Sequence, residues 1–577
     1  MKRILSSWVL AAAVLLSPVA AEACGGFFCS QTPIDQTGER VLFGVNDGNV
    51  TAHIQILYQG EAERFAWVLP LPSQPTRIGV GTDMLFQQLS NRTRPRFNVQ
   101  WMNNNGCGFY GWGFSQELAA DGGPPNAGGG PRKGVDVLEE DAVGPYDYAV
   151  IKGTTTDSGD AVFQWLKDND YDQPDMAKDI VTTYVAENHV FVAIRLQSNQ
   201  NTGDIQPLVM DFPFPASCIP LRLTSIAATE DMDVWVYMLG HHRAVPVNYF
   251  SVEINEKRID WIQNGSNYSE LAGEAVDTAA GRGFLTEFAG DTNDMKGVLW
   301  QPGKYDVDAL KKIKTPWDYM SALLAQNFPR TPLLQNLLRK HIPKPESLKE
   351  LSDQQFYNNL NKYKAQLSKQ DFDPAALTAD IEDKVLGPLM EANELFNQHR
   401  YMTRMYTRIS PSEMTRDPIF LFNPDLPNVN NVHKAIGKAF CKPGTQEVEK
   451  VVVTLENGTE LSFAGPFDYS DKPKLMDDGT LGGASAAVQR MYTVGSPEDI
   501  PQDRIAAVDA EFDSVTVGIA GNTNTGGTPG NPRPGMTSSG GSSGGCTAGT
   551  TGPMSGILFL LLATAGSLLV WRRKTVA

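Results

Sequence analysis

Residues 50–59, VTAHIQILYQ, alternate apolar with mostly polar side chains. This period of two is typical of a half-buried strand, because successive side chains of an extended chain point to opposite faces. The apolar members on one face are Val50, Ala52, Ile54, Ile56 and Tyr58. The run FAWVL (65–69) follows a short turn, so the two segments predict a hairpin. Pro70 and Pro72 end it, since proline has no N–H to donate to a ladder.

The period of two recurs along the first half of the chain and then gives way to a helical period. Further strands are expected at 148–151, 190–196, 207–212, 220–226 and 234–239, and two short helices at 160–167 and 176–185. After about residue 305 apolar residues recur at helical spacing, as in Leu377, Ile381, Val385 and Leu389. Strand alternation resumes at Val451, and Asn457-Gly458 predicts a hairpin turn.

Two short motifs mark the beginnings of helical segments. Thr315-Pro316-Trp-Asp318 combines a capping hydroxyl, a proline in the first turn and an acid near the positive end of the helix. Ser410-Pro-Ser-Glu413 is a capping box with a proline inside it. The segment from 305 to about 414 is therefore expected to be mostly helical, with Pro388 as a kink or an end.

These patterns predict an α+β protein with a mostly antiparallel β N-terminal half, a helical segment, a short C-terminal β segment and one C-terminal transmembrane helix. The expected divisions are a signal peptide (1–23), a β-rich part (24–304), a mainly helical part (305–440) and a β segment (441–517). A disordered stalk (518–553), a transmembrane helix (554–571) and a basic cytoplasmic tail (572–577) would follow.

The composition limits the possible functions. The 577 residues are 41% hydrophobic and 20% charged, which suits folded domains rather than wholesale disorder. The formal net charge is −17, and a nucleic-acid-binding protein would need a basic face. We therefore expect no nucleic-acid partner.

The N-terminus reads as an export signal. Lys2 and Arg3 precede an apolar run, and the triplet Ala21-Glu22-Ala23 is a small-residue cleavage site. Cleavage by signal peptidase after Ala23 would make Cys24 the first mature residue. Lipidation of Cys24 is an alternative, although the leucine usual three residues before a lipidated cysteine is replaced by Ala21.

The C-terminus reads as a membrane anchor on a flexible stalk. Residues 554–571 carry no charge and as a helix would span about 27 Å. The basic residues Arg572, Arg573 and Lys574 follow, which places the tail in the cytoplasm and the body outside. Residues 518–553 are rich in Gly, Ser, Thr and Pro, and their only charge is Arg533.

Cys546 in this stalk gives the three-part C-terminus a resemblance to sorting signals of myxobacterial surface proteins. The resemblance implies a sorting protease as a partner and Cys546 as the processing point. A plain single-pass anchor with an incidental cysteine is the alternative.

No motif in the chain predicts a catalytic, cofactor or metal site. GCGFYG (106–111) matches a dinucleotide fingerprint, but its surroundings are loop rather than a strand followed by a helix. DNDYD (168–172) resembles the start of a calcium loop, but the required glycine is Gln173. Cys24 and Cys29 flank two glycines and are expected to form a disulfide in an exported protein. With that pair, at least one of Cys107, Cys218 and Cys441 is free or bonded elsewhere.

Five stretches of the sequence resemble a bacterial family called domain of unknown function 2330. They are CGGFFC (24–29), FAWVLPLP (65–72), IPLRLT (219–224), FLTEFAG (284–290) and RISPSEMTRDP (408–418). They cover most of the region from residue 24 to about 418. The family is exported and has no established activity, so the resemblance implies no catalytic residue.

We expect an exported, membrane- or surface-anchored protein with a non-catalytic binding or envelope role and an unknown ligand. One alternative is an extracytoplasmic, hydrolase-like enzyme whose site is built from dispersed Asp, Glu and His. Another is a thiol-based role for Cys24 and Cys29, although their spacing is not the C-x-x-C of oxidoreductases.

Overall fold

The computed structural model describes residues 35–102, 135–197, 206–213, 216–465, 474–475 and 486–515, apart from positions 47, 60–65, 170, 172–173 and 358. The fold is mixed α+β, with a sheet-rich N-terminal half. Among the described residues no helix is long and apolar enough to cross a membrane. The predicted signal peptide, the stalk beyond residue 518 and the predicted transmembrane helix lie outside this part of the chain.

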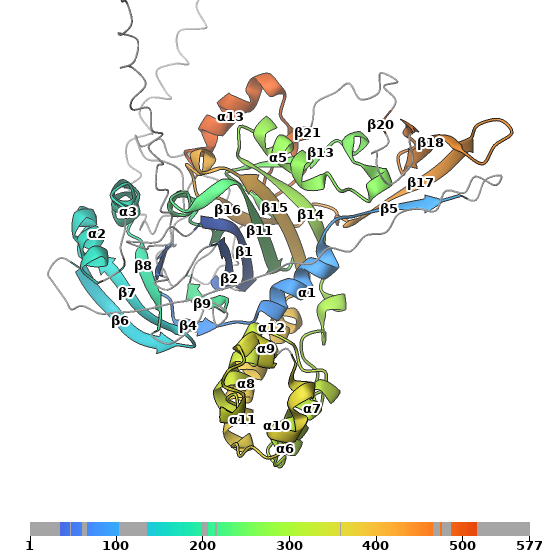
Figure 1. Cartoon of the computed structure of the whole chain (residues 1–577). Helices are drawn as coiled ribbons and strands as arrows, with labels where there is room; N and C mark the ends of the chain where they lie inside the picture. Colours follow the sequence, from blue (N-terminus) through green and yellow to red (C-terminus); the bar gives the residue numbers. More distant parts are fainter. Residues whose placement is uncertain are drawn as a thin grey trace, which may run out of the picture.

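A large central sheet organises the body (Figure 1). Its described strands occur in the order β22-β21-β13-β14-β15-β11-β1-β2-β9-β4. Most neighbours are antiparallel, but β1 runs parallel to β11, and β13 runs parallel to β14. The bounds are β1 Asp35–Asn46, β2 Asn49–Gln59, β4 Arg77–Val80, β9 Leu208–Pro213, β11 Ala228–Gly240, β13 Phe250–Ile254, β14 Gly283–Asp291, β15 Tyr401–Ile409, β21 Ala486–Arg490 and β22 Glu498–Asp499.

The strand predicted from residues 50–59 is confirmed as β2, but the predicted hairpin is wrong. β2 pairs with β1 and β9 in the central sheet. The FAWVL segment forms β3 (Ala66–Leu71), which pairs with β8 (Val190–Leu196) in a separate sheet. A short connection between two strands suggests a hairpin, whereas here the chain crosses from one layer to the other.

This second sheet lies face to face with the central sheet. Its order is β3-β8-β7-β6, with β6 at Val135–Val143 and β7 at Tyr146–Gly153. Buried side chains such as Val150, Val192 and Ile54 fill the space between the two sheets. The predicted short helices are confirmed as α2 (Gly159–Asp168) and α3 (Ala177–Ala186), and they cover the outer face of this sheet.

α2 and α3 are in close contact at Gly159, which allows a direct test of their packing. A Cβ added to Gly159 would lie 2.6–2.8 Å from atoms of Thr182, including its backbone Cα. We expect Gly159→Ala to lower the free energy of unfolding by about 1–3 kcal/mol, because the helices must separate. Gly273→Ala is the matched control: its Cβ would meet only Arg408 at 3.5 Å, so we expect a gain of up to about 1 kcal/mol. Urea unfolding measures both, and equal effects would contradict this packing.

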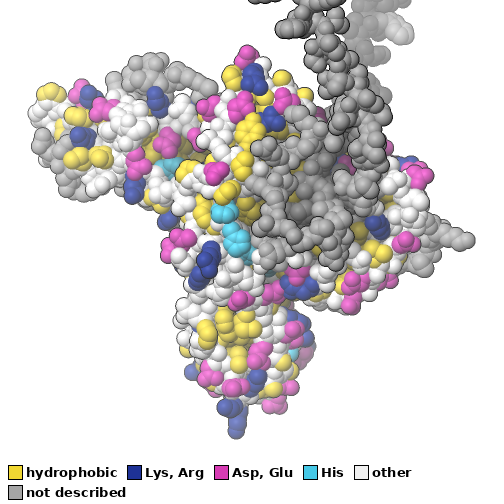
Figure 2. Space-filling view, turned by 180° about the vertical axis from the view of Figure 1, so that it is seen from behind, with side chains coloured by type: hydrophobic (Ala, Val, Ile, Leu, Met, Phe, Trp, Pro, Cys, Tyr) yellow, Lys and Arg dark blue, Asp and Glu magenta, His cyan; other side chains and the backbone are white. Residues whose placement is uncertain are grey.

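A helical lobe projects from the opposite face of the central sheet (Figures 1 and 2). It is inserted between β14 and β15 and packs its core with α1 (Asp83–Thr93) against Leu42, Tyr237 and Met402 of the sheet. Its main helices are α6 Val307–Leu310, α7 Pro316–Ala325, α8 Pro332–His341, α9 Asp353–Tyr357, α10 Lys364–Leu367, α11 Pro374–Ile381 and α12 Gly387–Gln398. The surface in Figure 2 mixes acidic and basic side chains over lobe and body.

The sequence signals inside the lobe are confirmed. Thr315 caps α7 by accepting a hydrogen bond from the amide of Asp318. Leu377, Ile381, Val385 and Leu389 are all buried. Just before Pro388, residues Glu382–Leu386 form a π-helical turn. A local distortion of this kind is expected there, because proline has no N–H with which to make the α-helical hydrogen bond.

Two secondary-structure predictions are wrong. The mainly helical segment does not extend to residue 440, because β15, β16 (Ile419–Asn423) and β17 (Val432–Cys441) lie beyond the last lobe helix. Residues 220–226 are not a strand but contain the helix α4 (Leu221–Thr224). A tertiary contact accompanies the helical turn, since Asp417 accepts a hydrogen bond from the backbone amide of Arg222.

The remaining elements are a second projecting sheet, called the arm below, two helices that cover one end of the central sheet, and a small three-stranded sheet. The arm is a sheet of order β20-β19-β18-β17-β5, with β5 Arg96–Trp101, β18 Val448–Leu455, β19 Glu460–Ala464 and β20 Lys474–Leu475. Gly458 has φ +82° in the predicted Asn-Gly turn between β18 and β19. Helices α5 (Tyr268–Thr278) and α13 (Ile505–Phe512) cover β13–β15 and β21. A small sheet, β10-β16-β12, contains β10 (Ser217–Cys218) and β12 (Arg243–Pro246).

Candidate functional site

The main candidate site is a cleft between the central sheet and the base of the arm. Its cavity volume is about 330 Å³, near the lower end of the size range of small-molecule sites. Strands β13 and β14 form one wall, and β5, β17 and the 3₁₀ turn Glu256–Arg258 form another. Apolar side chains such as Phe97, Val252 and Leu285 line the cleft together with Arg243, Glu287 and His433.

Glu287 lies in the wall of the cleft, at an irregularity in the sheet. The register between β14 and β15 shifts between Thr286 and Phe288, so Glu287 sits at a β-bulge, a feature that re-aims side chains. Only 4% of the residue is exposed. Burial raises the pKa of this carboxyl, while Arg404 and Tyr268 oppose the rise.

Both carboxylate oxygens of Glu287 have partners. The hydroxyl of Tyr268 donates to Oε1 at 2.8 Å, and the guanidinium of Arg404 forms an ion pair with Oε2. Burial and the neighbouring Glu287 raise the pKa of Tyr268 well above its usual value. Glu287 is thus a compensated structural charge rather than a free acid or base.

Arg243 differs because it has no counter-ion among the described carboxylates. Its Nη1 donates to the carbonyl of Pro427 at 3.3 Å, and its buried Nε has no hydrogen-bond partner. Burial lowers the pKa of Arg243, and the charges of Tyr401 and Glu253 only partly oppose this. A half-buried cation that lines a cleft without a paired anion is a ready contact for an anionic group.

The arm contributes an aromatic surface to the same cleft. The ring of His433 stacks on Phe97 with a centroid distance of 4.7 Å and an interplanar angle of 19°. Its Nδ1 lies 2.6 Å from Oε1 of Glu256, which holds the ring in place. The cleft therefore combines a cation, a flat apolar surface and carboxylates on its rim.

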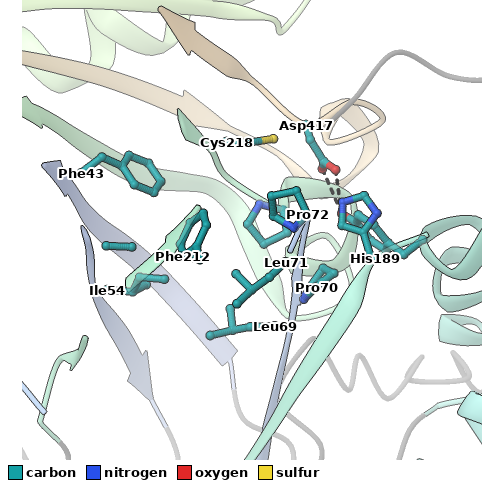
Figure 3. Close-up of a pocket in the computed structure, with 13 residues that line it drawn as sticks. Phe43, Ile54, Leu69, Pro70, Leu71, Pro72, His189, Phe212, Cys218 and Asp417 are labelled. Atoms are coloured by element: carbon teal, nitrogen blue, oxygen red, sulfur yellow. Dashed lines mark hydrogen bonds between the residues drawn. The ribbon is translucent and has the colours of Figure 1, made fainter. Parts of the chain in front are cut away.

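A second pocket lies between the two stacked sheets, next to Leu69–Pro72 (Figure 3). Phe43, Ile54 and Phe212 lie at one end, and Asp417 and His189 lie at the other. Its cavity volume is about 20 Å³, room for about one water molecule. Cys218 also lines the pocket.

A buried charge network forms the polar end of this pocket. Arg222 makes a bidentate contact to Glu187 at 2.9 and 2.6 Å, and its Nε and Nη2 donate to Oδ2 of Asp417 at 3.0 and 2.9 Å. The guanidinium lies over the ring of Tyr184 at 4.2 Å, and the hydroxyl of Tyr184 donates to Asp417. Burial alone would lower the pKa of Arg222, but Asp417, Tyr184 and Glu187 together raise it.

Comparison with known proteins settles the family. A family model described as an uncharacterized protein conserved in bacteria (DUF2330) matches residues 18–421. The chain belongs to the DUF2330 family. No curated protein matches it. A crystal structure of a mutated baculovirus P35 after caspase cleavage is similar at 10% identity and a TM-score of 0.20. That match covers 38% of this chain and 76% of the other, and a TM-score this low carries no argument.

In this DUF2330 protein the stretches that resemble the family converge on the second pocket. Leu69–Pro72 come from FAWVLPLP, Pro220 and Arg222 from IPLRLT, and Asp417 from the RISPSEMTRDP segment. Ala23, Cys24, Cys29 and Cys546, named from the sequence as processing or disulfide residues, lie outside the described residues. Cys218 and Cys441 are each disulfide-bonded. Within the described part of the chain, no group of three or more metal-ligating side chains is present.

Sequence reasoning did not find Arg243, Glu287 or Arg404. Two of these residues could have been found, because each is a charged residue inside an otherwise apolar strand. Glu287 lies in FLTEFAG (284–290), and Arg404 lies in YMTRMY (401–406). Such a charge needs a buried partner, and these two strands supply partners to each other. Arg243 had no comparable signal, because its lack of a paired carboxylate among the described residues depends on the tertiary fold.

Proposed function

We propose that this protein is an exported, membrane- or surface-anchored protein with a non-catalytic binding role. Its cleft between β13, β14 and the base of the arm would take a small ligand that carries an anionic group next to an apolar part. The observation that carries this proposal is the guanidinium of Arg243, which lines the cleft without a paired carboxylate among the residues that the structure describes.

The pairing of the other charges favours binding over catalysis. A general acid or base needs a proton-transfer atom that is free to reach a substrate. Both oxygens of Glu287 are engaged, so this buried carboxylate offers no such atom. The aromatic surface of Phe97 and His433 suits contact with a flat apolar group.

The ligand class can be tested with three probes that share a phenyl ring. We expect 3-phenylpropanoate and phenylalanine to bind with a Kd of about 1 mM or tighter, and phenethylamine, which lacks the carboxylate, not to bind. Arg243→Gln should weaken 3-phenylpropanoate binding by about 10–100-fold, because a charge-assisted contact is lost. Isothermal titration of the purified protein measures both effects.

Arg330→Gln is the matched control, since Arg330 is exposed on the helical lobe. It should leave the affinity unchanged. A saturable heat from phenethylamine equal to that from 3-phenylpropanoate, or an equal loss in the two variants, would contradict an anion contact at Arg243.

The alternative is a hydrolase-like enzyme in the same cleft. The observation in its favour is that a buried carboxyl with a raised pKa and a histidine line one concave site. Turnover of an ester or glycoside by the purified protein, lost in His433→Gln without loss of stability, would favour the enzyme over the binding protein.

Export and anchoring are supported by the two termini. Signal peptidase would cleave between Ala23 and Cys24, and residues 554–571 would hold the protein in a membrane unless a sorting protease cuts near Cys546. We expect the intact mass of the native protein from cell fractions to correspond to a chain that starts at Cys24. A chain that retains residues 1–23 would contradict export by this route.

A further inference from the structure

We propose that the cleft at Arg243 binds the end of an extended peptide, which adds a strand in the gap between β13 and β14 and places its terminal carboxylate against Arg243. This inference rests on the proposed function, because it takes the anionic group of the ligand to be the C-terminus of a peptide. It goes further by assigning the second contact to the backbone of the two strands.

The strands β13 and β14 separate at the cleft. They pair in parallel at Phe250–Gly283 and Ser251–Phe284. Beyond these pairs β14 continues alongside β15, whereas β13 continues alongside β21. The residues that follow the last pair, 252–254 and 285–287, all line the cleft. The cleft therefore lies in the gap that opens between two neighbouring strands of the central sheet.

Both edges of this gap present backbone hydrogen-bonding groups. The amide of Phe250 donates to the carbonyl of Arg282 at 2.9 Å, which identifies the edge of each strand that faces the other. Backbone groups alternate between the two edges of a strand, so those of Ile254 and Thr286 face the gap as well. Within the described part of the chain, no strand pairs with these two residues across the gap. Such an unpaired edge is a template for strand addition by a peptide.

Val429 closes one end of the gap, and Arg243 lies beside that end. The amide of Val429 donates to the carbonyl of Ala289 at 2.8 Å, and the amide of Ala289 donates back at 2.9 Å. Arg243 donates to the carbonyl of Pro427, two residues before Val429. An added strand must therefore end here, so the guanidinium would meet a chain terminus. A terminal carboxylate is attracted to this cation, whereas a terminal ammonium is repelled.

The last side chain of the peptide is expected to be aromatic or otherwise apolar. The stacked rings of Phe97 and His433 and the side chain of Leu285 line the cleft next to the gap. A flat apolar group can pack on such a surface. The cavity volume of about 330 Å³ limits the enclosed part of the ligand to the end of the peptide.

Isothermal titration of the purified protein with acetyl-Ala-Ala-Phe, which has a free carboxylate, tests this inference. We expect this peptide to bind at least about 10-fold more tightly than 3-phenylpropanoate, because it adds backbone hydrogen bonds to the same ring and carboxylate. In a matched ester analogue, an oxygen replaces the amide N–H of the phenylalanine. The ester should bind about 3–10-fold more weakly than the peptide. The C-terminal amide should bind at least about 10-fold more weakly than the free acid.

The possible outcomes separate this inference from the proposed function. Arg243→Gln should remove the preference for the acid over the amide, and the exposed control Arg330→Gln should preserve it. Strand addition is overturned, and small-anion binding stands, if 3-phenylpropanoate binds but the peptide binds no more tightly, or if peptide and ester bind equally. If neither 3-phenylpropanoate nor the peptide binds, the proposed function fails and this inference fails with it.

Discussion

Arg222→Met is expected to lower the free energy of unfolding by about 3–5 kcal/mol at neutral pH. The substitution keeps the volume of the side chain but removes the cation between Glu187 and Asp417. The side chains of these two acids are 7% and 1% exposed, so two carboxylates would remain buried without their guanidinium. Urea unfolding followed by tryptophan fluorescence measures the loss.

Arg504→Met is the matched control for this substitution. Arg504 contacts Glu498 at 3.2 Å, but the two side chains are 51% and 39% exposed, and an exposed pair contributes about 0–1 kcal/mol. The deficit of Arg222→Met should also shrink as the pH falls, because burial raises the pKa of Glu187 and protonation removes its unpaired charge. Equal losses in the two variants would show that the Arg222 network does not hold α4 to the loop at Asp417.

His53→Gln is expected to change how stability depends on pH. His53 lies in β2, is 1% exposed, and neither ring nitrogen has a hydrogen-bond partner within the described structure. Burial lowers the pKa of His53 from 6.5 to about 4, with a further decrease from Arg77 and a partial increase from Asp211. Below pH 6.5 the unfolded chain therefore binds a proton that the folded protein does not.

The sign of the effect follows from proton linkage. The contribution of His53 to stability is fully present above pH 6.5 and is lost as the pH falls toward 4. The glutamine variant has no such loss, so its stability relative to the native protein should improve by about 3 kcal/mol between pH 7 and pH 4. The exposed His242→Gln should show no such change, and a pH-independent difference for His53→Gln would contradict a buried neutral imidazole.

Local signals in the sequence predicted local structure well. The alternation in residues 50–59 produced β2, Thr315 capped α7, and the spacing of Leu377, Ile381, Val385 and Leu389 placed all four in the core. Ser410 and Glu413 form the predicted capping box. Each of these features depends on contacts within about one turn or one strand, which the order of residues displays directly.

The errors arose where partners are distant in sequence. β3 follows β2 closely but pairs with β8, more than a hundred residues further on. β15 reads as a continuation of the helical segment, yet it lies between β14 and β11 in the central sheet. The cleft could not be predicted for the same reason, because Phe97, Arg243, Glu287 and His433 come from four separate strands.

The most direct test of the binding proposal is a crystal structure of the protein with 3-(4-bromophenyl)propanoate, whose bromine can be located by anomalous scattering. We predict one bromine peak against Phe97 and Leu285, with the carboxylate in contact with the guanidinium of Arg243. A ligand bound elsewhere, or a cleft that stays empty at saturating concentrations, would contradict the assignment of this cleft as the binding site.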